Sequence, residues 1–285
     1  MPELPEVETI RGDLNKKILG KKIKDVKISK PKIIKGNVND FKKVLQGSFI
    51  KKIDRVGKLM IFVLSKSDKF LLIHLKMTGQ LIYVSRKETI SGGHNYPKID
   101  KLPNKFSHII FTFTDKSKLF YNDIRQFGYM KIVNKEGLKK VFSNFGLDPV
   151  ATKFKKNDFL RIIKDKKNNI KAFLLNQKFI AGIGNIYADE ILFDSRIKPS
   201  RRIDSLKNRE KEKLYLSIKK ILKKAIRMRG TTFSNYVDGR GNKGNFTNFL
   251  KVYQRQGHEC FKCGKKVRRI KIAGRGTHYC LVCQR

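Results

Sequence analysis

The sequence predicts an α+β protein of more than one domain: a β-sandwich with flanking helices, then a helical region, then a cysteine-bearing hairpin. Short runs rich in Ile, Val and Phe fill the region from about Ile23 to Val133. Beyond Pro149 the apolar residues recur at the three- and four-residue spacing typical of helices. All four cysteines lie in the last 26 residues. A chain of 285 residues is long enough for two domains and at least one sizeable core.

The first predicted element is a helix that begins near Pro5. Proline is favoured in the first turn of a helix, and the acidic Glu6 and Glu8 suit its positive end. Apolar residues then recur at spacings of three and four as far as Ile18, and Gly20 offers a C-terminal stop.

The next region predicts strands that are separated by short polar turns. The runs are Phe49–Ile53, Leu59–Leu64, Phe70–Leu75, His108–Phe113 and Lys118–Tyr121. Several short strands at this spacing indicate a β-sandwich. The stretch Ser85–Lys105 contains two adjacent glycines and two prolines, and it predicts a long mobile loop.

A linker is predicted at Phe145–Pro149, and the pattern that follows is helical. The predicted helices include Ile170–Leu175, Asn185–Phe193 and a longest one from about Asn208 to Met228. The helix Asn185–Phe193 begins directly after the glycine-containing turn Ala181–Gly184. A Gly-rich loop, Asp238–Asn245, precedes the cysteines.

The composition points to a polyanionic partner. Lys and Arg number 66 against 24 Asp and Glu, which gives a formal charge of +42. Such an excess favours nucleic acid, although scattered lysines, a ribosomal protein or a polymerase accessory factor would fit the charge alone.

No apolar run reaches the roughly 18–20 residues that span a bilayer. The start of the chain is acidic and proline-bearing, unlike a signal peptide, so we expect a cytoplasmic protein without a membrane partner.

The cysteines form two pairs, and each pair is separated by two residues. The pairs are Cys260 with Cys263 and Cys280 with Cys283, and sixteen residues lie between them. In a reducing compartment this pattern favours a metal site over disulfides. Four thiolates complete the tetrahedral shell of Zn²⁺ and leave no open position, so one structural zinc ion is predicted. Arg275, between two glycines, falls near the tip of the intervening hairpin and can approach a phosphate closely.

The N-terminus offers a nucleophile. Methionine is readily removed before proline, which would leave Pro2 with a free secondary amine. An α-amino group titrates near about 8 and lysine near about 10.4, and the positive end of the following helix favours the neutral amine further. A neutral amine can attack a sugar C1′, and the neighbouring Glu3 can supply the proton that opens the ring. Taken alone, Met-Pro-Glu is also what a frayed terminus before a helix looks like.

Five motifs in order give the chain a resemblance to the formamidopyrimidine-DNA glycosylase family, which excises oxidised purines. They are Met1–Thr9, Ile73–Gly79, Asp123–Gly128, Gly184–Ala188 and the cysteine hairpin. Gly184–Ala188 resembles the family's helix–two-turn–helix motif, and the cysteine hairpin resembles its zinc finger. The resemblance runs from residue 2 to residue 283 and so covers nearly the whole chain.

The resemblance assigns catalytic roles to four residues. It makes Pro2 the nucleophile that forms a Schiff base and Glu3 the proton donor. Lys58 matches the lysine that lies by the lesion's phosphate and assists β-elimination. Arg275 matches the zinc-finger arginine that grips phosphates around the damaged nucleotide and is associated with the final elimination. The implied activity is that of a glycosylase with abasic-site lyase activity by β,δ-elimination.

Further residues match the family's contacts to DNA. His74 and Asn185 would contact phosphates, and Lys167 is a weaker match within a run of charges. Met77, Arg125 and Phe127 match the trio that fills the space left by the flipped-out nucleotide. Met and Phe supply wedges between bases and Arg can hydrogen-bond the orphaned base. The loop Asp238–Asn245 would cover the flipped base.

The resemblance also implies an organisation and a partner. It divides the chain into a catalytic β-sandwich domain (1–147), a helix–two-turn–helix domain (148–235), a lesion-capping loop with its connector (236–257) and a zinc finger (258–285). The implied partner is double-stranded DNA that contains an oxidised base. The implied protein is a bacterial, cytoplasmic monomer that works at the nucleoid.

The sequence departs from the family's pattern at three positions, and two alternative functions remain open. Gln126 stands where many members have a second basic residue, Lys76 where glycine is common, and Phe106 where a histidine is usual. These put one DNA contact in doubt rather than the chemistry.

The first alternative is an endonuclease VIII-type enzyme for oxidised pyrimidines, which Leu4 and the intact trio disfavour. The second is a non-catalytic zinc-ribbon DNA-binding protein, which leaves Pro2 without a role.

Overall fold

The protein is described by a computed structural model over residues 1–66, 68–94, 102–231, 236–237 and 244–285. These residues form two compact units. Unit 1 comprises Met1–Ser143 and Met228–Thr247, and unit 2 comprises Asn144–Arg227 and Asn248–Arg285. The chain therefore leaves unit 1, builds most of unit 2, and returns briefly to unit 1 before it reaches the cysteines.

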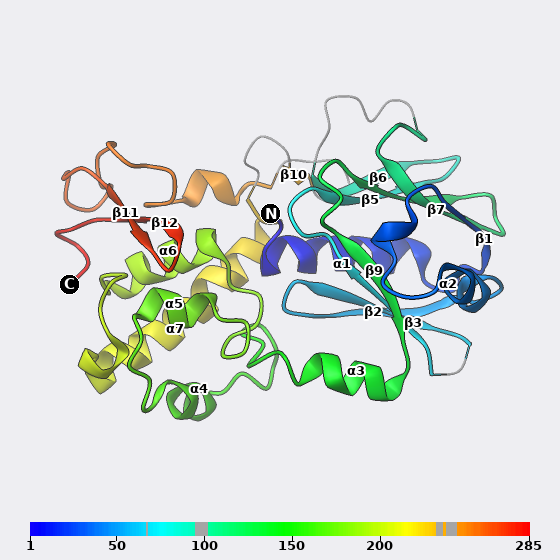
Figure 1. Cartoon of the computed structure of the whole chain (residues 1–285). Helices are drawn as coiled ribbons and strands as arrows, with labels where there is room; N and C mark the ends of the chain where they lie inside the picture. The colour runs from blue at the N-terminus through cyan, green and yellow to red at the C-terminus, as the bar shows by residue number, and fades with distance from the viewer. Residues whose placement is uncertain (67, 95–101, 232–235, 238–243) are drawn as a thin grey trace. The chain divides into compact units, whose positions relative to one another are not determined.

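Figure 1 shows the elements of both units. The helical elements are α1 (Leu4–Ile18), η1 (Pro31–Ile33), α2 (Val38–Leu45), α3 (Lys135–Phe142), α4 (Lys156–Ile163), α5 (Ile170–Leu175), α6 (Asn185–Ser195), η2 (Ile203–Ser205), α7 (Asn208–Arg227) and η3 (Phe246–Phe249). The strands are β1 (Ile23–Ile28), β2 (Ile50–Val56), β3 (Leu59–Leu64), β4 (Phe70–His74), β5 (Gly79–Val84), β6 (Thr89–His94), β7 (Ser107–Phe113), β8 (Lys118–Asp123), β9 (Tyr129–Val133), β10 (Tyr236–Val237), β11 (Arg268–Ile272) and β12 (Arg275–Tyr279).

Unit 1 is built on two sheets. One has the strand order β1-β7-β8-β5-β6-β10, and the other has the order β2-β3-β4-β9. Neighbouring strands in both are antiparallel. Alternate residues such as Phe111 of β7, Tyr121 of β8 and Phe62 of β3 share one buried cluster with Ile10 of α1. Alternation of this kind leaves one face of each sheet for the core, and the predicted β-sandwich is confirmed.

Helix α1 forms where the sequence predicts it. Glu3 is its N-cap residue and forms a reciprocal capping box with Glu6, while Pro5 occupies the first turn. The helix ends at Ile18, and Gly20 then adopts a left-handed φ of 75° that allows the chain to turn towards β1.

The prediction that Ser85–Lys105 is one long loop was wrong in its first part. Thr89–His94 forms β6, which pairs with β5 in a regular antiparallel register. One of the glycines that suggested a loop serves packing here, because a Cβ on Gly92 would lie 2.8 Å from Cγ1 of Ile10 in α1. Residues 95–101 of the predicted loop lie outside the described part of the chain.

Unit 2 combines helices α4 to α7 with the hairpin β11–β12. Aromatic rings fill its centre: the ring of Phe159 lies 6.4 Å from that of Phe173 and 5.9 Å from that of Tyr215, measured between centroids. The predicted helix at Ile170–Leu175 is confirmed without change, and the long helix ends one residue earlier than predicted, at Arg227. No helix in the described residues has the length and apolar character needed to cross a membrane.

Candidate functional site

The start of the chain is packed into unit 1 instead of fraying. Pro2 is buried and Glu3 is 4% exposed, whereas Met1 is 54% exposed. The backbone N–H of Glu3 donates to Oε2 of Glu6 at 2.8 Å. Oε1 of Glu6 in turn accepts from the backbone N–H of Thr231 at 2.8 Å. The Glu6 carboxylate therefore holds Pro2 and Glu3 in place from one side and the returning chain segment from the other.

Gly230 shows how closely that returning segment approaches. Its φ is 81°, and a Cβ added there would lie 2.6 Å from Oε1 of Glu6. Only glycine meets both conditions without strain. Residues 232–235 and 238–243 follow, so most of the predicted capping loop Asp238–Asn245 lies outside the described residues.

Lys58 lies in the tight turn between β2 and β3, where it is 8% exposed. The turn is tied to α1, because Nε of Arg55 lies 2.7 Å from Oε2 of Glu8. Burial raises the pKa of Glu8, but Arg11 and Arg55 outweigh it, so its pKa is lowered overall. The Glu8 carboxylate therefore stays ionised and the attachment persists at neutral pH.

His74 ends β4 and is held as a neutral ring. Its Nδ1 accepts the backbone N–H of Lys76 at 2.9 Å. Burial lowers the pKa of His74 to about 3, and the positive charges of Lys76 and Lys58 act in the same direction. A neutral ring whose Nδ1 accepts must carry its proton on Nε2. His74 therefore presents one neutral donor, and the structure brings it close to Lys58, since His74 pairs across the sheet with Leu59.

The predicted trio forms one exposed cluster, which we call the exposed trio (Met77, Arg125 and Phe127). Met77 is 40% exposed and Phe127 is 54% exposed. Nη1 of Arg125 lies 3.1 Å from the Met77 sulfur, and its guanidinium carbon lies 4.6 Å from the centre of the Phe127 ring. Gln126 lies between Arg125 and Phe127 in the sequence. It has a φ of 54°, and its buried Oε1 has no hydrogen-bond partner among the described residues. The side-chain oxygen of Gln126 is therefore buried, unlike the side chains of the exposed trio.

In unit 2, Asn185 begins α6 and reaches the cysteine-bearing hairpin. Its Nδ2 donates to the carbonyl oxygen of Gly276 at 2.9 Å. Arg275, the first residue of β12, is exposed, as is Lys167 in the loop between α4 and α5. The structure thus connects Asn185 with the hairpin tip that carries Arg275.

A buried ion pair behind this hairpin was missed by the sequence reasoning. Nζ of Lys171 lies 2.6 Å from Oδ1 of Asp189 and 2.8 Å from the hydroxyl of Thr277, and both charged side chains are 0% exposed. Oδ2 of Asp189 accepts the backbone N–H of His278 at 2.8 Å. The pair therefore joins α5, α6 and β12. The available signal was a charged residue on the apolar face of each of two helices.

Glu190, next to Asp189 on α6, organises the segment before the cysteines. Its carboxylate accepts three backbone N–H groups, from Lys251, Val252 and Tyr253, each at 2.9 Å. Burial raises the pKa of Glu190, and the three N–H donors offset this only in part. The chain that leads into the cysteine module is therefore fixed to the same helix as the hairpin.

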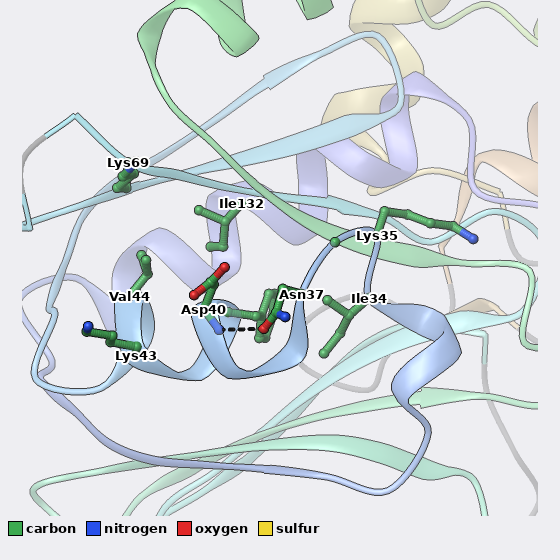
Figure 2. A pocket seen from close by; sticks show the side chains of 10 residues that line it. Ile34, Lys35, Asn37, Asp40, Lys43, Val44, Lys69 and Ile132 are labelled. Carbon is green, nitrogen blue, oxygen red and sulfur yellow. Dashed lines mark hydrogen bonds between the residues drawn. The ribbon is translucent and has the colours of Figure 1, made fainter.

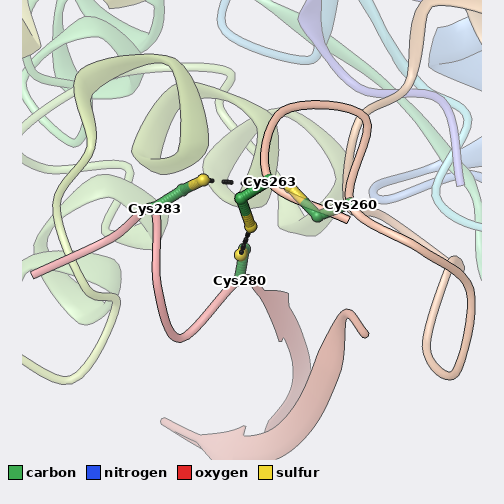
Figure 3. A group of neighbouring side chains, drawn as sticks. All are labelled: Cys260, Cys263, Cys280 and Cys283. Carbon is green, nitrogen blue, oxygen red and sulfur yellow. Dashed lines mark hydrogen bonds between the residues drawn. The ribbon is translucent and has the colours of Figure 1, made fainter. Parts of the chain in front are cut away.

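The four cysteines converge as predicted (Figure 3). Their sulfur atoms all lie within 4.8 Å of one another. The two knuckles approach through Cys263 and Cys280, whose sulfurs are 3.4 Å apart, and through Cys260 and Cys283, at 3.9 Å. Burial and the neighbouring thiols raise the pKa of Cys283 to about 12, so without a metal ion this thiol keeps its proton. A bound cation favours the thiolate and reverses this preference. Four thiols in this arrangement can bind a metal ion.

A pocket of about 380 Å³ lies elsewhere on unit 1, beside α2 (Figure 2). Its lining residues are Ile34, Lys35, Gly36, Asn37, Asp40, Phe41, Lys43, Val44, Lys69 and Ile132. None of the predicted site residues contributes to it. The predicted site residues of each unit therefore lie at turns and element ends and not around this pocket.

Comparison with known proteins gives matches along the whole chain. The model of the formamidopyrimidine-DNA glycosylase N-terminal domain matches residues 1–130, and that of the H2TH domain of the same enzymes matches residues 145–237. The formamidopyrimidine-DNA glycosylase of Pelotomaculum thermopropionicum is 37% identical over 288 residues, covering 100% of this chain and 99% of the relative. That of Carboxydothermus hydrogenoformans is 41% identical over 286 residues and covers 100% of both.

Solved structures agree with these relatives. The Lactococcus lactis Fpg protein bound to DNA with an abasic site has a TM-score of 0.87 and 33% identity, and 99% of each chain is covered. The same protein bound to DNA with an oxidised pyrimidine also has a TM-score of 0.87, with 34% identity and 99% coverage of each chain. A mutant of it was solved with DNA that contains Fapy-dG, with the same TM-score and coverage.

Proposed function

The chain belongs to the formamidopyrimidine-DNA glycosylase family, and from this premise we propose that it excises oxidised purines from duplex DNA and then cleaves the strand through the amine of Pro2. It is a DNA glycosylase of base-excision repair. The observation that carries the proposal is the burial of Pro2 and Glu3 at the start of α1. A nucleophile needs a fixed position relative to its proton donor, and a frayed terminus would provide none.

The proposed chemistry begins when removal of Met1 frees the secondary amine of Pro2. The nitrogen lone pair forms a bond to C1′ of the damaged nucleotide, and the bond from C1′ to the base breaks with its electrons leaving on the base. The proton displaced from the nitrogen passes to the Glu3 carboxylate and then to O4′, so the sugar ring opens and an iminium forms. The iminium acidifies the C2′ hydrogen, and loss of that proton expels the 3′ phosphate.

Other residues of unit 1 would then hold the phosphates and assist elimination. We assign Lys58 to the phosphate of the lesion and to β-elimination. The neutral His74 would donate its Nε2–H to a phosphate oxygen without adding charge. Arg125 of the exposed trio would hydrogen-bond the orphaned base, from which we expect a preference for cytosine over adenine opposite the lesion.

In unit 2 we assign Asn185 and Lys167 to the DNA backbone. Arg275 would grip the phosphates around the damaged nucleotide and take part in the final elimination. Its support is the hairpin tip, which Asn185 and the buried pair of Lys171 and Asp189 hold in place. The excess of 66 basic over 24 acidic residues suits duplex DNA as the partner.

We propose that the metal held by the four cysteines is a single Zn²⁺ ion. Four sulfur ligands fill a tetrahedral shell, so the ion would stabilise the hairpin and take no direct part in the reaction. We retain the fourfold division into residues 1–147, 148–235, 236–257 and 258–285, with the last part as the zinc finger. We also expect a monomer that acts at the bacterial nucleoid.

The lesion class separates this proposal from the endonuclease VIII alternative. The Lactococcus lactis protein has been solved with both Fapy-dG and an oxidised pyrimidine, so binding alone does not separate the two. Leu4 and the complete exposed trio support the purine preference. The non-catalytic zinc-ribbon alternative has no support left, because the family match includes the glycosylase N-terminal domain.

The test uses duplexes that carry either 8-oxoguanine or thymine glycol opposite their normal partner bases. The processed enzyme should cleave the 8-oxoguanine strand faster, by about 10-fold or more, which corresponds to about 1.4 kcal/mol of discrimination. Glu3→Gln should lose base excision and keep some cleavage at a preformed abasic site. Faster cleavage at thymine glycol would contradict the proposal and favour the alternative of an endonuclease VIII-type enzyme.

A further inference from the structure

Asp123 is the last residue of β8, and its side chain is 0% exposed. Its Oδ1 accepts a hydrogen bond from the hydroxyl of Thr78, and its Oδ2 accepts the backbone N–H of Gly128 at 2.8 Å. The chemistry proposed above gives this carboxylate no role. It connects the turn that follows β4 with the turn that follows β8.

The hydroxyl of Thr78 extends this connection. It accepts the backbone N–H of Arg125 at 3.0 Å while it donates to Asp123. A hydroxyl has one donor and two acceptor sites, so both bonds form together. Thr78 is 7% exposed, and water therefore does not readily replace either bond.

The two turns need such an external constraint because their backbones are strained. Lys76 has a φ of 49° and Gln126 has a φ of 54°, a region that residues other than glycine adopt reluctantly. Only glycine fits at position 128, because a Cβ there would lie 1.8 Å from the hydroxyl oxygen of Tyr121. The first turn has a local hydrogen bond from the N–H of Lys76 to His74, and the hydrogen bonds of Asp123 and Thr78 then hold the two turns to each other.

The same two turns carry the exposed trio, with Met77 on the first and Arg125 and Phe127 on the second. We propose that Asp123, acting through Thr78, is the positioning residue that keeps the exposed trio assembled for entry into the duplex. This rests on the proposed function. A carboxylate suits the task because it only accepts, and its described partners, including the Tyr121 hydroxyl at 3.3 Å, are all neutral donors.

The test is a matched pair of variants at one position. Thr78→Val removes the hydroxyl that bridges Asp123 and Arg125 and keeps the shape of the side chain, whereas Thr78→Ser keeps the hydroxyl. Tyr121→Phe is a second control, because it removes a hydrogen bond to the same carboxylate, and the hydroxyl packed against Gly128, while it leaves the Thr78 bridge between Asp123 and Arg125 in place. Each protein is assayed for base excision from an 8-oxoguanine duplex under single turnover and for cleavage of a preformed abasic site. Arg125→Ala sets the scale of a lost trio member.

Thr78→Val should lose about 10-fold or more in base excision, as expected for a lost buried hydrogen bond to a charged group. It should lose less in abasic-site cleavage, because no base has to be extruded there. Thr78→Ser and Tyr121→Phe should retain both activities. Equal activities of Thr78→Val and Thr78→Ser would overturn the inference, as would equal losses on both substrates.

A second variant covers the case in which Thr78→Val does not fold. Asp123→Asn presents an amide N–H₂ where one oxygen accepted, so it should show the same selective loss of excision, and no selective loss would overturn the inference. Failure of the proposed function is a different result. In that case the unmodified enzyme itself would leave 8-oxoguanine in place.

Discussion

Asp123 in unit 1 and Asp189 in unit 2 are both fully buried carboxylates, yet different kinds of partner stabilise them. The partners that the structure gives Asp123 are hydroxyls and one backbone N–H. Asp189 faces the ammonium group of Lys171 at 2.6 Å and also accepts from His278. Each lies directly behind a segment whose exposed side chains we assign to DNA.

The difference indicates two ways of supporting a segment that presents exposed side chains. The hydrogen bonds of Asp123 and Thr78 that hold the turns of the exposed trio come from neutral groups, so one donor can be removed without leaving an opposite charge unpaired. The hairpin with Arg275 is held by an ion pair in which neither member tolerates the loss of the other. We therefore expect unit 1 to respond to substitutions in small steps and the hairpin of unit 2 to respond sharply.

The largest effect should follow from loss of the proposed zinc ion. Cys263→Ser removes one of four ligands, and a structural zinc site contributes about 10–16 kcal/mol to folding of small zinc domains. The hairpin should lose its order and DNA binding should be abolished. Cys263→His is the matched control, because histidine is a common zinc ligand. Metal analysis together with DNA binding at fixed salt gives the measurement, and active protein without zinc would contradict the prediction.

The next largest effect should come from the ion pair. Lys171→Met leaves Asp189 buried and without its cation, which should lower the free energy of unfolding of unit 2 by about 3–5 kcal/mol. Asp123→Asn should cost unit 1 less, about 1–3 kcal/mol, because only hydrogen bonds change. Urea unfolding of the full chain compares the two.

A double variant sharpens this second prediction. Lys171→Met combined with Asp189→Asn removes both charges and should recover part of the stability that Lys171→Met loses. If Lys171→Met and Asp123→Asn prove equally costly, or if the double variant recovers nothing, the contrast between the two carboxylates does not hold.

The smallest effect concerns pH and His74. Its pKa in the folded protein is about 3, below the ordinary value of 6.5, so between these values the unfolded chain binds a proton that the folded one does not. The free energy of unfolding should therefore fall as the pH falls through this window, by about 1 kcal/mol between pH 6.5 and 5.5. His74→Asn keeps an acceptor for the N–H of Lys76 and should lack this step. Urea unfolding of both proteins at pH 7 and pH 5.5 checks it, and identical pH dependence would count against a neutral His74.

The features that could be predicted from the sequence are local ones. The helix at Ile170–Leu175 and the pairs of cysteines depend on spacings of a few residues, and both appear as expected. Strand β6 was missed because its two glycines signal a loop, whereas Gly92 lies in a strand where it admits Ile10 of α1. The short helices α2 and α3 were also missed, since each has only eight residues, which is too short for an apolar spacing of three and four to repeat.

The sequence could propose the members of the candidate site, but it could not indicate what supports them. The motif residues lie at turns and element ends, where their surroundings are set by distant parts of the chain. Thr78 and Asp123 are separated by 45 residues and Lys171 and Thr277 by 106, and no periodic pattern reports such pairings. A charged residue within an apolar helix face, such as Lys171, is the one signal that could have revealed the buried pair.

The most direct measurement for the account is the site of covalent attachment between enzyme and DNA. Processed enzyme is incubated with an 8-oxoguanine duplex in the presence of borohydride, and the trapped peptide is mapped. The account predicts a reduced link between the nitrogen of Pro2 and the sugar C1′, and no adduct with protein that retains Met1, because its Pro2 nitrogen is an amide. An adduct at Lys58 or another lysine, with Pro2 unmodified, would contradict the assignment of the nucleophile.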